Sequence, residues 1–357
     1  MDPRWDRLAE ILVSYSTDTR PGDKVLIMMQ EVETFPLARA VYAQAVRRGA
    51  FPQVIFGSAY LDRELMRHGD EEQIGRVPDL EAYGMEWADV YIGLRGARNP
   101  FESQGIPSQR IALHRRAQGH VSALRTALTR WVLVRVPGEP LAQQAGVSLL
   151  ETMDFFFAAT LRDWTAESRR FAALAEIFQA AERVTVTGRG TDLTFSTRGR
   201  RYAVGDGHLN MPDGEIYTAP VDDSAEGEIT FDLPGVYGGV FIEGIHLAFR
   251  RGRVVAATAR THEELLHRLL DTDEGASRIG EFGVGTNDGI PHFFGDILYD
   301  EKMAGTVHIA LGRAYEHCGG VNRSAVHWDL IKDLRTEGTI QLDDRVVFER
   351  GRWCVSW

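Results

Sequence analysis

Residues 21–29, Pro-Gly-Asp-Lys-Val-Leu-Ile-Met-Met, indicate how the first part of the chain folds. The stretch opens with a turn sequence, and the apolar run from Val25 to Met29 that follows is typical of a buried parallel strand. Residues 34–48 have the apolar spacing of a helix, with Thr34 as its cap. Val54-Ile55-Phe56 then begins a second strand, and Val90-Tyr91-Ile92 a third. The sequence therefore predicts an α/β domain built on βαβ units and an open sheet.

The pattern changes near residue 184, where alternating strands replace buried ones. Segments 184–196 and 245–255 each alternate in polarity around a Gly-containing turn, as β-hairpins do, and a helix is expected over 261–270. We therefore predict an α/β N-terminal domain at 1–183 and a sheet-rich α+β C-terminal domain at 184–357. No Gly-x-Gly-x-x-Gly follows the early strands, so the first domain is interpreted as a scaffold or dimerisation domain rather than a nucleotide site.

Composition and charge exclude several classes of function. The chain has 357 residues, 44% of them hydrophobic and 25% charged, and its 51 acidic residues against 40 basic ones give a net charge of −11. Because phosphate contacts need clustered Lys and Arg, we expect no nucleic-acid partner and no membrane partner. Two cysteines cannot form a disulfide framework, the N-terminus has no signal-peptide pattern, and the apolar runs are too short to span a membrane. We expect a cytoplasmic protein.

Candidate metal ligands cluster in the second domain. In Val-His327-Trp-Asp329-Leu, an extended strand would point His327 and Asp329 to the same face, which makes half of a metal site. A surface histidine beside a solvated aspartate would explain the pair equally well. If residues 305–315 form a helix, His308 and Tyr315 share one stripe but lie about 10.5 Å apart along its axis. Tyr315 is then read more simply as a core residue with a bonded hydroxyl.

Several carboxylates complete the set of candidates. Glu215 stands between a turn and a short segment bounded by prolines, and Glu281 is flanked by three glycines, which permit close backbone approach to a bound group. For an isolated glutamate, however, an exposed loop position is the more common explanation. Asp300 and Glu301 could serve a site, or could stabilise the N-terminus of a following helix.

These segments together resemble a known family. The blocks Asn210-Met-Pro-Asp-Gly-Glu215-Ile-Tyr-Thr-Ala-Pro220, Gly280-Glu281, Asp300-Glu301, His308-Ile-Ala-Leu-Gly-Arg-Ala-Tyr315 and Asn322-Arg-Ser-Ala-Val-His327-Trp-Asp329 occur in this order. They resemble the signature blocks of the thermophilic-type metalloaminopeptidases, the aminopeptidase T and aminopeptidase S group. The strong blocks cover about residues 187–353. One departure is Lys302, which stands where an Asn is common after the Asp-Glu pair.

The resemblance implies a dinuclear metal site in a homodimeric aminopeptidase. Its two divalent ions would be cobalt, zinc, manganese or magnesium, and its ligands would be Glu215, Glu281, His308, Tyr315, His327 and Asp329. We hypothesise that a metal-bridged hydroxide hydrolyses the first bond of a peptide with a free N-terminus. In this hypothesis Glu281 bridges the ions, Glu301 shuttles protons, and Tyr315 ligates a metal or donates to the oxyanion.

Two alternatives remain open at the level of sequence. Dihydroxypyridine ring-opening dioxygenases share this fold but hold one non-haem Fe(II) through two His and one carboxylate, and His327, Asp329 and a further His could build that triad. Glu215 and Glu281 argue against it, because a mononuclear iron site does not need them. A non-catalytic binding protein that kept the fold is the second alternative.

Overall fold

The computed structural model describes residues 2–357, which divide into two compact units. The first unit runs to Arg162 and also includes Gly207–Pro212, and the second consists of Asp163–Asp206 and Asp213–Trp357. Across residues 2–357, no helix combines the length and the apolar character needed to cross a membrane. The sequence prediction places the domain boundary at residue 183, after a helix that this division groups with the second unit.

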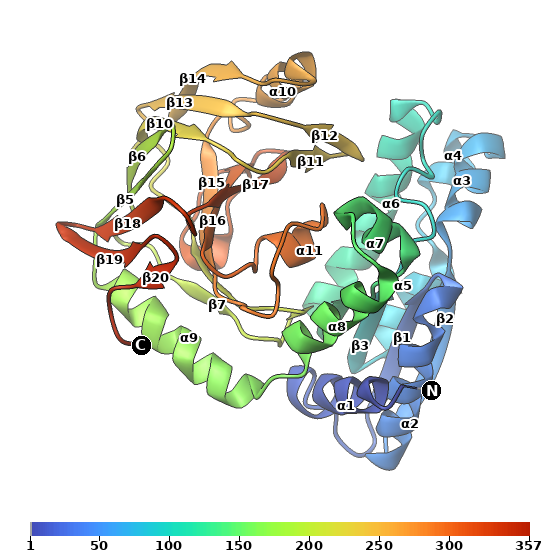
Figure 1. Ribbon diagram of the computed structural model, residues 1–357. Helices are drawn as coiled ribbons and strands as arrows, with labels where there is room; N and C mark the ends of the chain where they lie inside the picture. Colours follow the sequence, from blue (N-terminus) through green and yellow to red (C-terminus); the bar gives the residue numbers. More distant parts are fainter. Residues whose placement is uncertain (1) are drawn as a thin grey trace. The chain divides into compact units, whose positions relative to one another are not determined.

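The first unit is built on a parallel sheet with the strand order β2-β1-β3-β4-β8. Strands β2, β1 and β3 of this sheet are labelled in Figure 1. Its strands are β1 (Lys24–Gln30), β2 (Phe51–Gly57), β3 (Val90–Arg95), β4 (Arg130–Arg135) and β8 (Asn210–Met211). Val25 and Ile27 of β1 are fully buried, as the apolar run predicts, because helices cover both faces of a parallel sheet.

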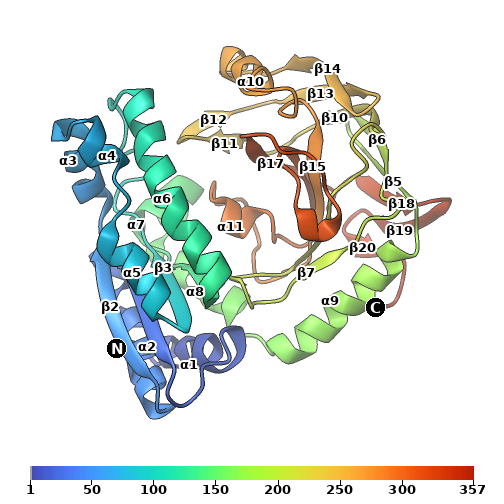
Figure 2. The same cartoon turned by 180° about the vertical axis from the view of Figure 1, so that it is seen from behind.

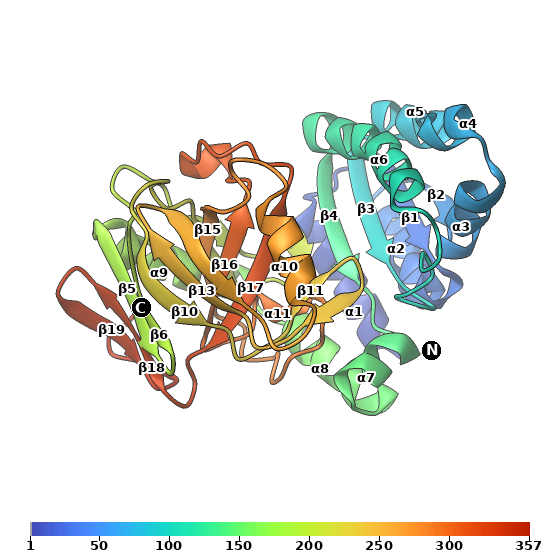
Figure 3. The same cartoon turned by 90° about the horizontal axis from the view of Figure 1, so that it is seen from above.

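Helices α1 and α2 lie on one face of this sheet, and α5 and α6 lie on the other (Figures 2 and 3). The helices of this unit are α1 (Arg4–Ile11), α2 (Phe35–Arg47), α3 (Ala59–His68), α4 (Glu71–Gly75), α5 (Asp79–Trp87), α6 (Ser108–Leu128), α7 (Glu139–Ala145) and α8 (Leu149–Thr160). A short π-helix (Leu12–Ser16) and a 3-10 turn (Val32–Thr34) precede β1 and α2 respectively. Leu26, Tyr91 and Leu133 of the sheet pack with Met85 of α5 and Val121 of α6 in one apolar cluster.

The second unit contains a long antiparallel sheet with the order β14-β13-β10-β6-β5-β18-β19-β20. In chain order its strands are β5 (Arg183–Gly188), β6 (Thr191–Ser196), β10 (Glu226–Thr230), β13 (His246–Arg250), β14 (Arg253–Thr258), β18 (Gly338–Leu342), β19 (Arg345–Glu349) and β20 (Arg352–Trp353). The pairs β5–β6 and β13–β14 are the two hairpins that the sequence predicts.

A second antiparallel sheet of this unit, with the order β17-β16-β15-β9-β7, carries the candidate site. Its strands are β7 (Ala203–Gly205), β9 (Glu215–Thr218), β15 (Ile279–Gly285), β16 (Thr306–Gly312) and β17 (His327–Asp333). The two sheets meet where Phe195 of β6 packs on Phe282 of β15, with ring centroids 5.0 Å apart. The unit also contains a β-ribbon and helices, namely β11 (Gly235–Tyr237), β12 (Val240–Ile242), α9 (Trp164–Gln179), α10 (Glu263–Leu270), α11 (Ile297–Asp300) and a 3-10 turn (Glu316–Cys318).

The predicted fold class, α/β followed by sheet-rich α+β, is confirmed. Helix α9 groups with the second unit because Phe178 near its end packs against the rings of Tyr202, Phe282 and Trp353. The helix considered for residues 305–315 is wrong, because Thr306–Gly312 form strand β16 between β15 and β17. Its apolar residues alternate with the others, so they cover only one face of the strand.

Candidate metal centre

Three adjacent strands place a small residue between two carboxylates, with one carboxylate on each side of it. Glu281 of β15 lies opposite Ala310 of β16, and Ala310 lies opposite Asp329 of β17. Residues opposite each other in an antiparallel sheet share a face, so the three side chains form one row across it. The methyl group of Ala310 leaves space between the two acids, where a larger side chain would separate them.

A glycine gives His308 its position on the same face. His308 is two residues from Ala310 on β16 and lies opposite Gly283 of β15. A Cβ atom on Gly283 would come within 2.1 Å of the His308 ring, so this position has room for the imidazole only because it is glycine. The ring therefore extends over β15 toward Glu215, the first residue of β9.

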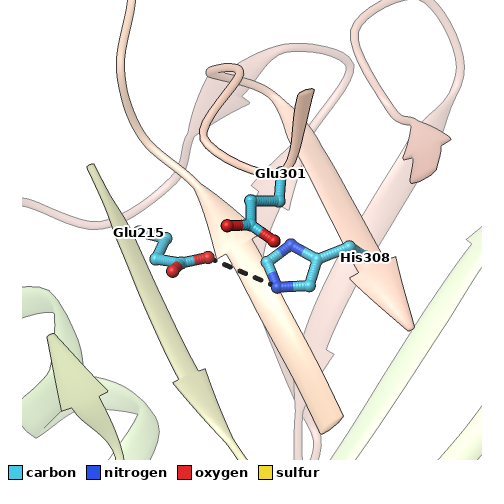
Figure 4. Close-up of side chains that lie close together, drawn as sticks. All are labelled: Glu215, Glu301 and His308. Atoms are coloured by element: carbon cyan, nitrogen blue, oxygen red, sulfur yellow. Dashed lines mark ion pairs between the residues drawn. The ribbon is translucent and has the colours of Figure 1, made fainter. Parts of the chain in front are cut away.

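The first candidate ligand group consists of Glu215, Glu301 and His308 (Figure 4). His308 Nε2 lies 3.3 Å from Glu215 Oε2, and both side chains are buried. Glu301 follows α11, and its carboxylate turns toward the same ring (Figure 4). Each of the three residues offers a ligand atom within 4.8 Å of the others.

The second candidate group consists of Glu281, His327 and Asp329. His327 Nε2 lies 3.4 Å from Glu281 Oε2 and 3.6 Å from Asp329 Oδ2. His327 Nδ1 lies 2.8 Å from the carbonyl oxygen of Arg313, so Nδ1–H donates there and Nε2 is left facing the carboxylates. Glu281 connects the two groups, because its Oε1 lies 3.5 Å from His308 Nε2 while its Oε2 faces His327.

A buried lysine, for which the sequence predicts no role in the site, lies beside the first group. Lys302 is 0% exposed, and its ammonium donates to Glu215 Oε1 at 2.6 Å and to Glu301 Oε1. Asp213 Oδ1 lies 3.9 Å from the same nitrogen. The sequence shows Lys302 only as a departure from the Asn common in the resembled family and as a basic residue directly after an acidic pair, which is far more often a solvated surface feature.

Tyr315 lies next to the second group, at the start of the 3-10 turn that follows β16. Its ring centroid is 5.3 Å from that of His327 and 5.5 Å from that of Tyr217. Burial and the nearby charges of Glu281 and Asp329 raise the pKa of Tyr315. The phenol is therefore a neutral hydroxyl in the absence of a metal ion, and it stands close enough to the site to act in it.

When no metal ion is bound, burial and the mutual repulsion of the carboxylates favour protonation at this site. Burial raises the pKa of Glu215 to about 8 and that of Asp329 to about 6. Burial opposes the charged form of Glu281 as well, but contacts from His308 and His327 outweigh it and lower the pKa of Glu281 to about 2. Burial lowers the basicity of the two imidazoles, yet the carboxylates around them raise the pKa of His308 to about 9 and that of His327 to about 10.

The residues present fit divalent metal ions. Among the described residues, four buried polar atoms of this site lack a hydrogen-bond partner: Glu215 Oε2, Asp329 Oδ1 and both ring nitrogens of His308. Unpaired buried polar atoms are rare, and their convergence here is the pattern expected of a metal site. Carboxylate oxygens and imidazole nitrogens form a mixed donor set suited to ions such as zinc, cobalt or manganese.

Comparison with known proteins agrees with this geometry. Residues 1–353 match the family described as thermophilic metalloprotease (M29). The chain is 28% identical to aminopeptidase T of Thermus thermophilus, over 98% of both chains. The structure of wild-type AmpT from Thermus thermophilus superposes with a TM-score of 0.86 at 26% identity, covering 99% of both chains. The chain belongs to the M29 family of thermophilic metalloproteases and is a hydrolase that acts on peptide bonds, as the resemblance implies.

A dioxygenase is similar in fold alone. The structure of 2,5-dihydroxypyridine dioxygenase from Pseudomonas putida KT2440 superposes with a TM-score of 0.63 at 16% identity, covering 98% of this chain and 96% of that one. The four carboxylates of the site, from Glu215, Glu281, Glu301 and Asp329, exceed what a single iron with two His and one carboxylate requires. The dioxygenase alternative is therefore not favoured.

The structure also corrects several expectations for single residues. Glu215 and Glu281 are buried strand residues, so the exposed-loop interpretation of both is wrong. Asp300 and Glu301 lie at the C-terminal end of the short helix α11, so they do not stabilise a helix N-terminus. His327 and Asp329 do lie on one strand, but both are largely buried, and the surface-pair interpretation is wrong for them.

Proposed function

We propose that the protein is an aminopeptidase that removes N-terminal residues from peptides at a site for two divalent ions. The observation that carries the proposal is the pair of neighbouring ligand groups connected by Glu281, with one carboxylate oxygen toward each group. The ions would be cobalt, zinc, manganese or magnesium, held by Glu215, Glu281, His308, Tyr315, His327 and Asp329. Glu281 would be the ligand that both ions share.

Bound ions of this kind polarise a carbonyl group, anchor a free α-amine and lower the pKa of water. The residues of the chain supply the rest of the chemistry. Glu301 would accept a proton from the attacking water and return it to the leaving amine, because its carboxylate faces the site while Lys302 holds one of its oxygens. Tyr315 would either ligate an ion or donate its hydroxyl hydrogen to the oxyanion of the tetrahedral intermediate.

We propose that the side chain of the N-terminal residue occupies a cavity beside His327 and Asp329. This cavity has a volume of about 140 Å³. Its wall is about half apolar: Val236, Tyr237 and Phe293 are among its apolar residues, and Asp300 lines it together with His327 and Asp329. The volume and the apolar part of the wall suit a medium-sized apolar side chain such as that of leucine.

Two further parts of the proposal rest on the resemblance. We propose that the protein is a homodimer, and the edge strand β2 supports this because it exposes Phe51, Val54 and Phe56. Light scattering with Phe56→Glu, which should shift a dimer to a monomer, tests it. A cytoplasmic location stays a prediction, which cell fractionation would test.

The test of function is hydrolysis of leucine p-nitroanilide by chelator-treated protein before and after cobalt is added back. We expect activity only with metal. His327→Ala should lose bound metal and activity together, whereas His267→Ala, at an exposed position on α10, should keep both. Metal-dependent activity that survives in His327→Ala would refute the site. Failure of all divalent ions together with iron-dependent oxygen uptake would instead favour the dioxygenase.

A further inference from the structure

The first unit contains a cavity that the proposed peptidase chemistry does not use. It has a volume of about 260 Å³, and all of its lining residues belong to this unit. Gln30 at the end of β1 and Arg95 at the end of β3 both line it. The chain passes from β1 outward to β2 and then returns to the other side of β1 as β3, so the β1–β3 boundary is a topological switch point. Open α/β sheets bind ligands at the carboxyl ends of their strands at such a point.

One side of this cavity is positively charged. Arg125 projects from α6 on the same stripe as Gln118 and Val121, and it lines the cavity together with Arg95. Burial and the neighbouring charge of Arg95 lower the pKa of Arg125. The Arg125 guanidinium stacks 4.4 Å from the ring of Trp131, which fixes its plane. Its Nε is buried and has no hydrogen-bond partner among the described residues.

The other side of the cavity is negatively charged. Asp62 of α3 and Glu81 of α5 both line it. Burial and the neighbouring Asp62 raise the pKa of Glu81, and burial also raises that of Asp62, which faces His114 at 3.6 Å. Within residues 2–357 no ion pair joins Arg125 to either acid. Arg125 and the two acids therefore line one cavity without pairing with each other.

We infer that this cavity binds a small zwitterion, with its carboxylate at Arg95 and Arg125 and its ammonium at Asp62 and Glu81. Free amino acids and short peptides are the members of this chemical class that a cavity of this volume accepts. A planar guanidinium with an unused N–H matches a carboxylate, and two acids that share a wall match an ammonium group. The inference is independent of the proposed function, because it uses no residue of the metal centre.

The test is equilibrium dialysis of radiolabelled L-leucine and L-leucyl-L-leucine against the full-length protein after metal removal, so that neither probe is hydrolysed. We expect saturable binding of at least one probe. N-acetyl-leucine, which lacks the ammonium group, and leucine amide, which lacks the carboxylate, should each bind at least about tenfold more weakly. Absence of saturable binding, or equal binding of N-acetyl-leucine, would overturn the inference.

Variants locate the binding within the first unit. Arg125→Met and Glu81→Gln should each weaken binding by about tenfold or more, whereas Arg116→Met, at an exposed position of α6 outside the cavity, should leave it unchanged. Circular dichroism and thermal midpoints report whether each variant is folded, and the ligand series on the unaltered protein needs no variant. Equal binding by folded Arg125→Met and Arg116→Met proteins would refute this location.

Discussion

Lys302→Met offers the sharpest test of the electrostatics of the metal centre. The substitution keeps the length of the side chain but removes a positive charge that is 2.6 Å from Glu215 Oε1 and also contacts Glu301. At an effective dielectric constant of 20, attraction over 2.6 Å to an ionised Glu215 amounts to roughly 6 kcal/mol, so the measurement is made above the Glu215 pKa of about 8. Desolvation of the ammonium offsets part of this, so we expect the free energy of unfolding of the metal-free protein to fall by about 3–5 kcal/mol.

A divalent ion should recover much of that loss. It brings positive charge to the same carboxylates, and binding to the folded state stabilises by about 2.7 kcal/mol for each site at a hundred times the dissociation constant. The gain should exceed that of the unaltered protein, because the ion no longer competes with the Lys302 ammonium for Glu215. Urea unfolding in the presence of a chelator measures the loss of stability, and urea unfolding with excess zinc measures the recovery.

Lys332→Met is the matched control. Lys332 is also buried and also pairs with an acid, Asp232, at 2.8 Å, but it points to the opposite face of β17 from His327 and Asp329. The Lys332→Met variant should be less stable than the unaltered protein, and zinc should stabilise both proteins by the same amount. Equal recovery in the two variants, or a loss below about 1 kcal/mol in Lys302→Met, would refute the reasoning.

Three further predictions concern the site and its cavity. Gly283→Ala should displace His308, weaken metal binding at least about tenfold and lower the free energy of unfolding by about 1–3 kcal/mol. Gly119→Ala, in open space on α6, is the control and should be neutral or slightly stabilising. Calorimetric metal titration of both variants checks this, and unchanged metal affinity in Gly283→Ala would contradict it. On folding, the pKa values of Glu215, Asp329, His308 and His327 are raised and that of Glu281 is lowered, so between about pH 5 and 9 the metal-free protein binds more protons at this site when it is folded than when it is unfolded. Its stability should therefore fall as pH rises from about 5 to 9 while metal affinity rises, and chelated protein that gains stability over this range would show the opposite. Val236→Trp, which fills the cavity beside His327, should lower kcat/KM for leucine p-nitroanilide about tenfold relative to alanine p-nitroanilide; an unchanged ratio would place the substrate side chain elsewhere.

Local sequence determined the secondary-structure elements whose patterns involve only residues close together in the chain. The apolar run at Val25–Met29 is a buried parallel strand because both faces of such a strand are covered, and no distant residue is needed to predict that. Alternation likewise predicts the β5–β6 hairpin and the strand that carries His327 and Asp329. The candidate ligands themselves were identified by residue type and by the order of the blocks, neither of which requires a structure.

Tertiary structure alone decided how those ligands meet. A helix over residues 305–315 would place His308 and Tyr315 on one stripe, but residues 306–312 pair with β15 and β17, so His308 is a strand residue. The β-branched residues of this segment suit a strand, and its strand neighbours come from distant parts of the chain. The row of Glu281, Ala310 and Asp329 joins residues far apart in the sequence, so its spacing exists only once the strand register is set. The role of Lys302 also depends on tertiary structure. Its acidic neighbours in the chain do not by themselves bury it, and the buried ion pair forms only because the fold places Glu215 of β9 beside it.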